Sequence, residues 1–128
     1  MPKVMLVDDD RTTVSLLKML LELDGFAVQI AEQGQLALDK ANAEHPDLFM
    51  LDFHLSDMDG VTLVKTLRSM PAFTKTPIVV ASGLNVSDEA MRAGASLFLI
   101  KPFEPGDLAT LFRNLISGAT SNGPDRKR

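Results

Sequence analysis

The sequence contains no cysteine among its 128 residues. This absence excludes disulfide bonds, thiolate chemistry and cysteine-based metal sites, and it fits a reducing compartment. The most apolar region, residues 16–23, is broken by Lys18 and Glu22, so we expect no membrane span. The first ten residues lack the long apolar core of a secretion signal, and we therefore expect a cytoplasmic protein.

An excess of positive charge is also missing. The chain has 13 lysine and arginine residues against 17 aspartate and glutamate residues, which gives a formal net charge of −4. This balance argues against a nucleic-acid surface. Because the chain also has no DNA-binding motif, we expect no direct contact with nucleic acid or with a membrane.

The length and composition suit one domain with one hydrophobic core. The hydrophobic fraction of 45% and the charged fraction of 23% are ordinary for a folded domain. Because the apolar patterns end near Gly118, we predict one domain over residues 1–118. Residues 119–128 hold Ser, Asn, Gly, Pro and mixed charges without an apolar pattern. We interpret them as a flexible tail or the start of a linker.

Strand-like and helix-like patterns alternate five times along the chain. Short apolar runs predict strands at residues 4–7, 26–31, 48–51, 78–81 and 97–100. Amphipathic patterns predict helices that begin after Asp10 and near Gly34, Gly60, Val86 and Pro105. Crossover helices of this length imply an α/β fold, in which a parallel sheet has helices on both faces.

The strand predicted at residues 48–51 organises the rest of the chain. Its four consecutive apolar residues are typical of a strand that is buried on both faces. Asp52 follows directly and should lie at the edge of the sheet where open α/β folds bind ligands. The other polar residues that follow strand ends are Asp8, Asp9, Ser82 and Lys101. We therefore expect these five side chains to share one edge.

Each of these residues also has an ordinary structural explanation. Acidic residues before a helix often cap it, an aspartate after a strand is often a turn residue, and a lysine before proline is usually solvated. The combination of residues nevertheless indicates a functional site, because three carboxylates on one rim repel each other unless a cation joins them. Carboxylates with room for water are ligands that Mg²⁺ prefers, so we predict a magnesium site at Asp8, Asp9 and Asp52.

A bound cation gives Asp52 a chemical use. A carboxylate can act as a nucleophile on phosphorus and form an aspartyl phosphate. The metal would neutralise charge on the transferred group. The hydroxyl of Ser82 could donate to one phosphoryl oxygen, and Lys101 could pair with another.

The ordered set of motifs resembles the receiver domain of two-component response regulators, chemotaxis-type regulators among them. The resemblance runs from Lys3 to about Ser117. The matching motifs are Val7-Asp8-Asp9, Leu51-Asp52 with Asp57-Met58-Asp59-Gly60, Ser82, Ala93-Gly94-Ala95 and Lys101-Pro102-Phe103. The resemblance implies a flavodoxin-like three-layer sandwich of five strand–helix units, with a parallel sheet of order 2-1-3-4-5.

The resemblance also implies a role for each residue that could hold the metal. Asp52 would be the phosphoacceptor. Asp9 and Asp52 would ligate Mg²⁺ directly, and Asp8 mainly through water. The backbone carbonyl of His54 would complete the protein ligands.

Further implied roles concern the switch and its partners. Ser82 would be the switch hydroxyl, Lys101 the basic partner of the phosphoryl group, and Phe98 the aromatic switch position. A sensor histidine kinase or a histidine phosphotransfer protein would donate the phosphoryl group. Phosphorylation would then change the surface that binds a downstream protein or an output domain.

Three features depart from the family pattern. Ser56 stands where the family usually has proline, so the turn after Asp52 is expected to be looser. His54 is an uncommon residue beside the phosphorylation site. The chain between Ser82 and Lys101 is shorter than usual by roughly three residues, which is nearly one helical turn. Because the missing turn falls in the fourth helix, the usual output surface is expected to be altered.

Three alternatives to a phosphoacceptor switch remain open. One is a phosphohydrolase of the haloacid-dehalogenase type, which would need a second aspartate where this chain has His54. Another is a receiver-like interaction module without phosphorylation, although all five site residues are present. The third is flavin or nucleotide binding, for which residues 8–10 offer three aspartates in place of a glycine-rich phosphate loop. We expect a switch whose own chemistry is at most self-phosphorylation and autodephosphorylation.

Overall fold

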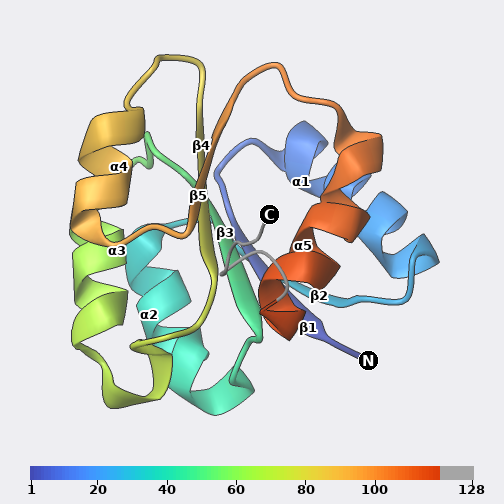
Figure 1. The fold of residues 1–128 in the computed structure, drawn as a ribbon, viewed down its shortest axis with the longest axis horizontal. Coiled ribbons are helices and arrows are strands. Elements are labelled where there is room, and N and C mark those ends of the chain that lie inside the picture. The colour runs from blue at the N-terminus through green and yellow to red at the C-terminus, as the bar shows by residue number, and fades with distance from the viewer. Residues whose placement is uncertain (119–128) are drawn as a thin grey trace.

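The computed structural model describes residues 1–118 as a central sheet with helices on both faces (Figure 1). The strands are β1 (Lys3–Val7), β2 (Ala27–Ala31), β3 (Leu48–Asp52), β4 (Ile78–Ser82) and β5 (Leu97–Ile100). They are all parallel to their neighbours, and the order is β2-β1-β3-β4-β5. The predicted flavodoxin-like topology is confirmed. The segment interpreted as a tail or linker, residues 119–128, lies outside the described residues.

Five helices complete the three layers. They are α1 (Arg11–Leu23), α2 (Gly34–Glu44), α3 (Gly60–Ser69), α4 (Ser87–Ala93) and α5 (Leu108–Ser117), with short 3₁₀ turns η1 (Pro71–Phe73) and η2 (Pro105–Asp107). Helices α1 and α5 cover one face of the sheet, and α2, α3 and α4 cover the other (Figure 1). None of the helices in residues 1–118 combines the length and the apolar character needed to cross a membrane.

The central strand β3 is apolar on both faces, as the sequence predicts. Leu48 and Met50 pack with the residues of α1 and α5, whereas Phe49 and Leu51 pack with those of α2, α3 and α4. This alternation follows from the two-residue period of a strand. It leaves Asp52, the last residue of β3, at the carboxyl edge of the sheet.

Residues next to α1 in the sequence determine where this helix begins and ends. The Asp10 carboxylate accepts hydrogen bonds from the backbone N–H groups of Thr12 and Thr13, which confirms Asp10 as the N-cap. Gly25 follows the last turn with a φ of 93°, a conformation that glycine adopts without strain.

Several strand ends differ from the sequence prediction by one residue, and the differences at β4 and at the last helix concern residues named above. Ser82 is the last residue of β4 and does not lie beyond the strand. The predicted last helix is divided, because Pro105 begins η2 and α5 begins only at Leu108.

Helix α4 has only seven residues, as expected from the short chain between Ser82 and Lys101. It ends at Gly94, which has a φ of 118°. Leu84 and Met91 are left exposed, with 62% and 44% of their surface accessible.

Candidate functional site

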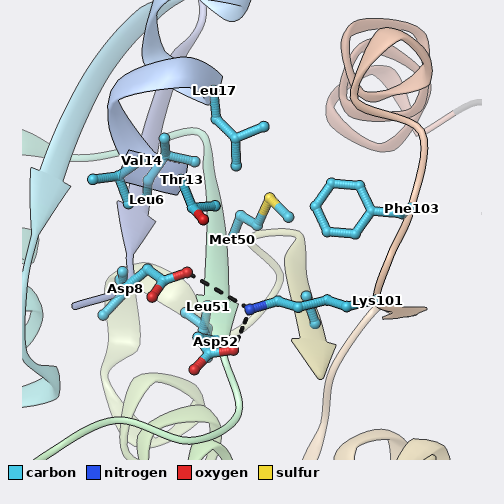
Figure 2. A pocket seen from close by; sticks show the side chains of 12 residues that line it. Leu6, Asp8, Thr13, Val14, Leu17, Met50, Leu51, Asp52, Lys101 and Phe103 are labelled. Atoms are coloured by element: carbon cyan, nitrogen blue, oxygen red, sulfur yellow. Dashed lines mark hydrogen bonds and ion pairs between the residues drawn. The ribbon is translucent and has the colours of Figure 1, made fainter. Parts of the chain in front are cut away.

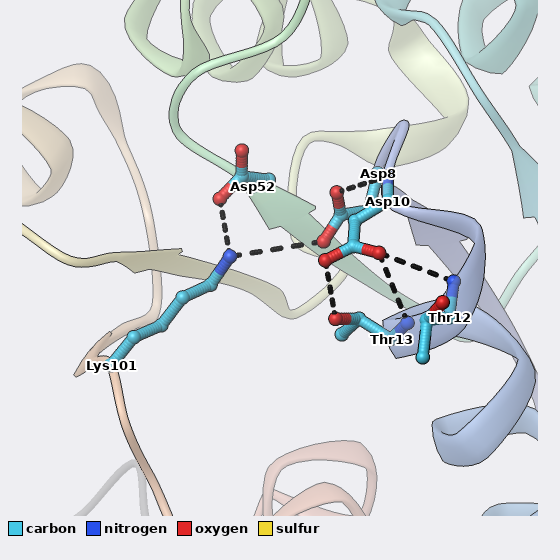
Figure 3. Close-up of polar contacts among 6 residues, drawn as sticks. All are labelled: Asp8, Asp10, Thr12, Thr13, Asp52 and Lys101. Atoms are coloured by element: carbon cyan, nitrogen blue, oxygen red, sulfur yellow. Dashed lines mark hydrogen bonds and ion pairs between the residues drawn. The ribbon is translucent and has the colours of Figure 1, made fainter.

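Lys101 joins two carboxylates at the carboxyl edge of the sheet. Its Nζ atom lies 2.7 Å from Oδ1 of Asp52 and 3.8 Å from Oδ2 of Asp8 (Figures 2 and 3). These residues follow or end strands β5, β3 and β1, which the parallel topology brings to one edge. The exposed fractions of the side chains of Lys101, Asp8 and Asp52 are 34%, 13% and 12%. Partial burial strengthens such charge-assisted contacts, because less water screens them.

The charges of Asp8 and Asp52 repel each other even though Lys101 lies beside both carboxylates. Burial raises the pKa of Asp8 above its ordinary value, the N–H of Asp10 opposes that effect, and the charges of Asp52 and Asp9 add to it. Burial lowers the pKa of Lys101, but the hydrogen bond and charge of Asp52, helped by Asp8, raise it overall. Lys101 therefore stays protonated. The edge thus holds two carboxyl groups and one ammonium group, and it is acidic in composition.

A small cavity lies beside this cluster, on the face of the sheet covered by α1 and α5. Its volume is about 20 Å³, which is roughly enough for one water molecule. Asp8, Thr13, Asp52 and Lys101 form its polar end, and Phe103 closes one side (Figure 2). The remaining walls are apolar, and they include Leu6, Val14, Leu17 and Met50.

The other two predicted metal ligands lie outside the lysine cluster. Asp9 is exposed in the loop after β1. His54 is also exposed, forms an antiparallel bridge with Asp59, and places its ring 4.9 Å from the ring of Phe53.

The donor chemistry nevertheless fits a hard cation. Within residues 1–118, no three His, Cys, Asp or Glu side chains come together as a closed metal site. Mg²⁺ is usually held by one or two carboxylates and keeps several waters, so a closed group is not required. Asp8 and Asp52 supply partly buried carboxylate oxygens on this acidic edge, and Asp9 stands next to Asp8 in the chain.

Ser82 faces away from the cavity. Its side chain is fully buried, and its Oγ atom accepts a hydrogen bond of 3.0 Å from the N–H of Leu84. The preceding residue, Ala81, lines the cavity, and successive side chains of a strand point to opposite faces. Phe98 is half-buried and packs with the core on the side of α2, α3 and α4. The switch roles of Ser82 and Phe98 stay predictions.

Two further residues line the cavity, and one residue of the loop after Asp52 makes a long-range contact; none of the three was predicted to do so. Thr13 and Phe103 line the cavity. Phe103 belongs to the Lys-Pro-Phe motif, which could have indicated it. Asp57 contacts the start of α2, more than twenty residues earlier in the chain, and no local pattern indicates such a contact.

Comparisons with known proteins identify the family. The model of the response regulator receiver domain matches residues 4–113. The transcriptional regulatory protein PrrA of Mycobacterium tuberculosis is 35% identical over 94% of this chain and 54% of its own length. The chemotaxis response regulator CheY4 of Vibrio cholerae is 29% identical, with a TM-score of 0.84 over 90% of this chain and 98% of that chain. This chain belongs to the response regulator receiver domain family, whose members are phosphorylation-dependent switches.

The comparisons also limit which properties of the similar proteins can be assigned to this chain. The chain spans about half the length of the curated relatives it matches. The receiver domain of a sensor histidine kinase from Pseudomonas aeruginosa was solved with a magnesium ion coordinated in its active-site cleft. That structure has a TM-score of 0.82 over 91% of this chain and 98% of its own, but it is 23% identical, so the likeness shows the fold alone.

Proposed function

We propose that Asp52 is the phosphoacceptor of a two-component phosphorelay and that its phosphorylation depends on Mg²⁺. The observation that carries this proposal is the Asp52 carboxylate, which lies at the carboxyl end of the central strand and is held by Lys101 at 2.7 Å. Membership of the receiver domain family supports the same assignment.

The transfer involves one bond formed and one bond broken. Lys101 binds Oδ1 of Asp52, so Oδ2 is the oxygen that this lysine leaves for attack on phosphorus. The new oxygen–phosphorus bond replaces the phosphorus–nitrogen bond of a phosphohistidine, and the bonding electrons return to the imidazole. The donor is a sensor histidine kinase or a histidine phosphotransfer protein.

The residues around Asp52 have separate roles in this reaction. Asp8, Asp9, Asp52 and the backbone carbonyl of His54 would hold Mg²⁺, which supplies positive charge beside the transferred group when it is bound. Lys101 is close enough to Asp52 to pair with a phosphoryl oxygen there. Ser82 would donate its hydroxyl proton to another oxygen, since its Oγ atom only accepts in its contact with the Leu84 amide.

The proposal describes a switch and not a hydrolytic enzyme. A downstream protein or an output domain would read the phosphorylated surface, and the reaction would take place in the cytoplasm. The family match does not support the haloacid-dehalogenase alternative. His54 also occupies the position where that alternative needs a second aspartate.

Intact-mass measurement of the full chain tests the assignment. After incubation with acetyl phosphate and Mg²⁺, the wild type should gain the mass of one phosphoryl group, and chelation of the metal should prevent the gain. Asp52→Asn should gain nothing. Asp39→Asn, which removes the same charge from an exposed position on α2, should behave as the wild type. Stoichiometric labelling of Asp52→Asn would disprove the assignment.

A further inference from the structure

The loop that follows Asp52 is closed at its base. His54 and Asp59 form an antiparallel bridge, and the N–H of Gly60 donates a hydrogen bond of 2.6 Å to the carbonyl of Phe53. A side chain at residue 60 would place its Cβ atom 3.0 Å from the Cα atom of Phe53, so glycine permits this close approach. The two ends of the loop are therefore held together beside the phosphorylation site.

The tip of the same loop is bound to α2. The Asp57 carboxylate accepts hydrogen bonds of 2.9 Å from the backbone N–H groups of Gly34 and Gln35. These groups lie in the first turn of the helix, where N–H groups have no partner within the helix. The N-cap residue of α2, Gln33, makes no capping hydrogen bond with its side chain. Asp57 thus caps α2 from a different segment of the chain.

Two further observations show that this contact is specific. The hydrogen bonds from Gln35 and Gly34 lower the pKa of Asp57 below its ordinary value, against a smaller opposing effect of burial. A side chain at residue 34 would place its Cβ atom 2.6 Å from Sδ of Met58, so Gly34 provides the space that Met58 fills. We call the contacts of Asp57 and Met58 with Gly34 and Gln35 the α2 clamp.

We propose that Asp57 is a positioning residue for the site at Asp52, because the α2 clamp holds the segment between the base and the tip of the loop. This segment begins with His54 at the base and continues through residues 55 and 56, and the carbonyl of His54 is the one assigned above to the metal. Proline at residue 56 would fix one backbone dihedral, but this chain has Ser56 and lacks that constraint. The clamp supplies the missing restriction from outside the loop. The part of this inference that concerns Mg²⁺ rests on the proposed function.

Hydrogen exchange and Mg²⁺ titration of full-length variants test the clamp. In Asp57→Ala without metal, the amides of Gly34, Gln35 and residues 53–58 should exchange about tenfold faster, because local opening becomes easier. The dissociation constant for Mg²⁺ should rise by about tenfold, a size typical for the loss of a group that orients metal ligands. Asp39→Asn, the charge-matched control on the same helix, should change neither quantity.

A second variant separates positioning from helix capping. Asp57→Ala combined with Gln33→Asp gives α2 a local capping carboxylate, so the start of the helix should recover its protection. The loop amides should remain fast and Mg²⁺ binding should remain weak, because the two hydrogen bonds from α2 to the side chain of residue 57 are still missing. Recovery of loop protection and Mg²⁺ affinity in this double variant would overturn the proposal and leave only a capping role.

Hydrogen exchange without metal tests whether Asp57 holds the loop, and this test does not depend on the proposed function. Unchanged exchange of residues 53–58 in Asp57→Ala would overturn the clamp even if phosphorylation occurs as proposed. A wild-type protein that binds no Mg²⁺ would contradict the proposed function, whereas the exchange of the loop would still show whether Asp57 holds it.

Discussion

At the residue scale, Asp8 is a carboxylate whose charged form is disfavoured by its surroundings. Burial, with the charges of Asp52 and Asp9, raises its pKa in the folded state. The folded protein therefore binds this proton more tightly than the unfolded chain. It follows that the contribution of Asp8 to stability falls as the pH rises from the ordinary value of 3.8 through the raised folded value.

We predict that Asp8→Asn stabilises the metal-free protein at neutral pH. The free energy of unfolding should rise by about 1 kcal/mol, since polar functional sites commonly trade stability for activity. The asparagine oxygen can still accept the hydrogen bond from the N–H of Asp10. Urea unfolding followed by circular dichroism measures the change, because the chain has no tryptophan or tyrosine for fluorescence.

The same substitution at Asp9 is the matched control. Asp9 is exposed, so Asp9→Asn should leave the metal-free stability within about 0.5 kcal/mol of the wild type. The stabilisation by Asp8→Asn should also shrink at a pH below 3.8, where the wild-type carboxyl group is protonated in both states. An advantage that is independent of pH would contradict the electrostatic explanation.

Asp9 should matter for the metal and not for the fold. We predict that Asp9→Ala weakens Mg²⁺ binding by about tenfold or more, because it removes a proposed direct ligand. Calorimetric titration of the folded protein measures this loss. An unchanged titration curve would exclude Asp9 from the ligand set.

At the scale of elements, one partly buried guanidinium group holds the carboxyl end of α4. Arg68 on α3 donates to the carbonyl oxygens of Gly94, Phe73 and Thr76 at 2.7 to 2.9 Å, and to the hydroxyl of Ser96 at 3.3 Å. Burial lowers the pKa of Arg68, but the guanidinium group stays protonated, so all of these hydrogen bonds are charge-assisted.

We predict that Arg68→Ala lowers the free energy of unfolding by about 2 to 4 kcal/mol, because it leaves several part-buried carbonyls without a donor. Denaturant unfolding measures the loss. Arg92→Ala removes an exposed guanidinium from α4 and should cost at most about 0.5 kcal/mol. Equal losses in the two variants would refute the special role of Arg68.

The amino end of α4 has weaker support than its carboxyl end. Leu84 is largely exposed, and the helix has only seven residues. We predict that residues 84–92 are the least protected part of the domain in hydrogen exchange, and that they gain protection with beryllofluoride and Mg²⁺, together with β5 and α5. The amides of β3 are the internal reference. Equal protection of residues 84–92 and β3, unchanged by beryllofluoride, would point to another output face.

At the scale of the whole molecule, ligands of the site should stabilise the entire fold. Beryllofluoride with Mg²⁺ at one hundred times the dissociation constant should add about 2.7 kcal/mol to the free energy of unfolding, because only the folded state binds. Thermal unfolding should therefore shift upward by roughly 10 °C. Asp52→Asn should show no shift with beryllofluoride. A shift of equal size in that variant would place the binding elsewhere.

Much of this architecture could be predicted from local patterns. The apolar run of β3 predicts a buried strand, and the position of Asp52 at its end follows. The N-cap at Asp10 is local as well. The surroundings of Ser82 were not predicted, because its hydroxyl is fully buried and bonded to the Leu84 amide, and the packed fold decides both. The contacts of Asp57 and Arg68 join segments far apart in sequence, and only the packed fold determines them.

Arg68 holds α4 at its carboxyl end only, through the carbonyl oxygen of Gly94. Gly94 precedes β5 and lies near the amino edge of the sheet, opposite the edge that carries Asp52. If phosphorylation displaces Ser82, we expect the displacement to be largest at Leu84, which lies between Ser82 and α4, and smallest at Gly94, which Arg68 holds. We therefore expect binding of a partner over Leu84 to depend strongly on phosphorylation, and binding of a partner beside Gly94 to depend on it little.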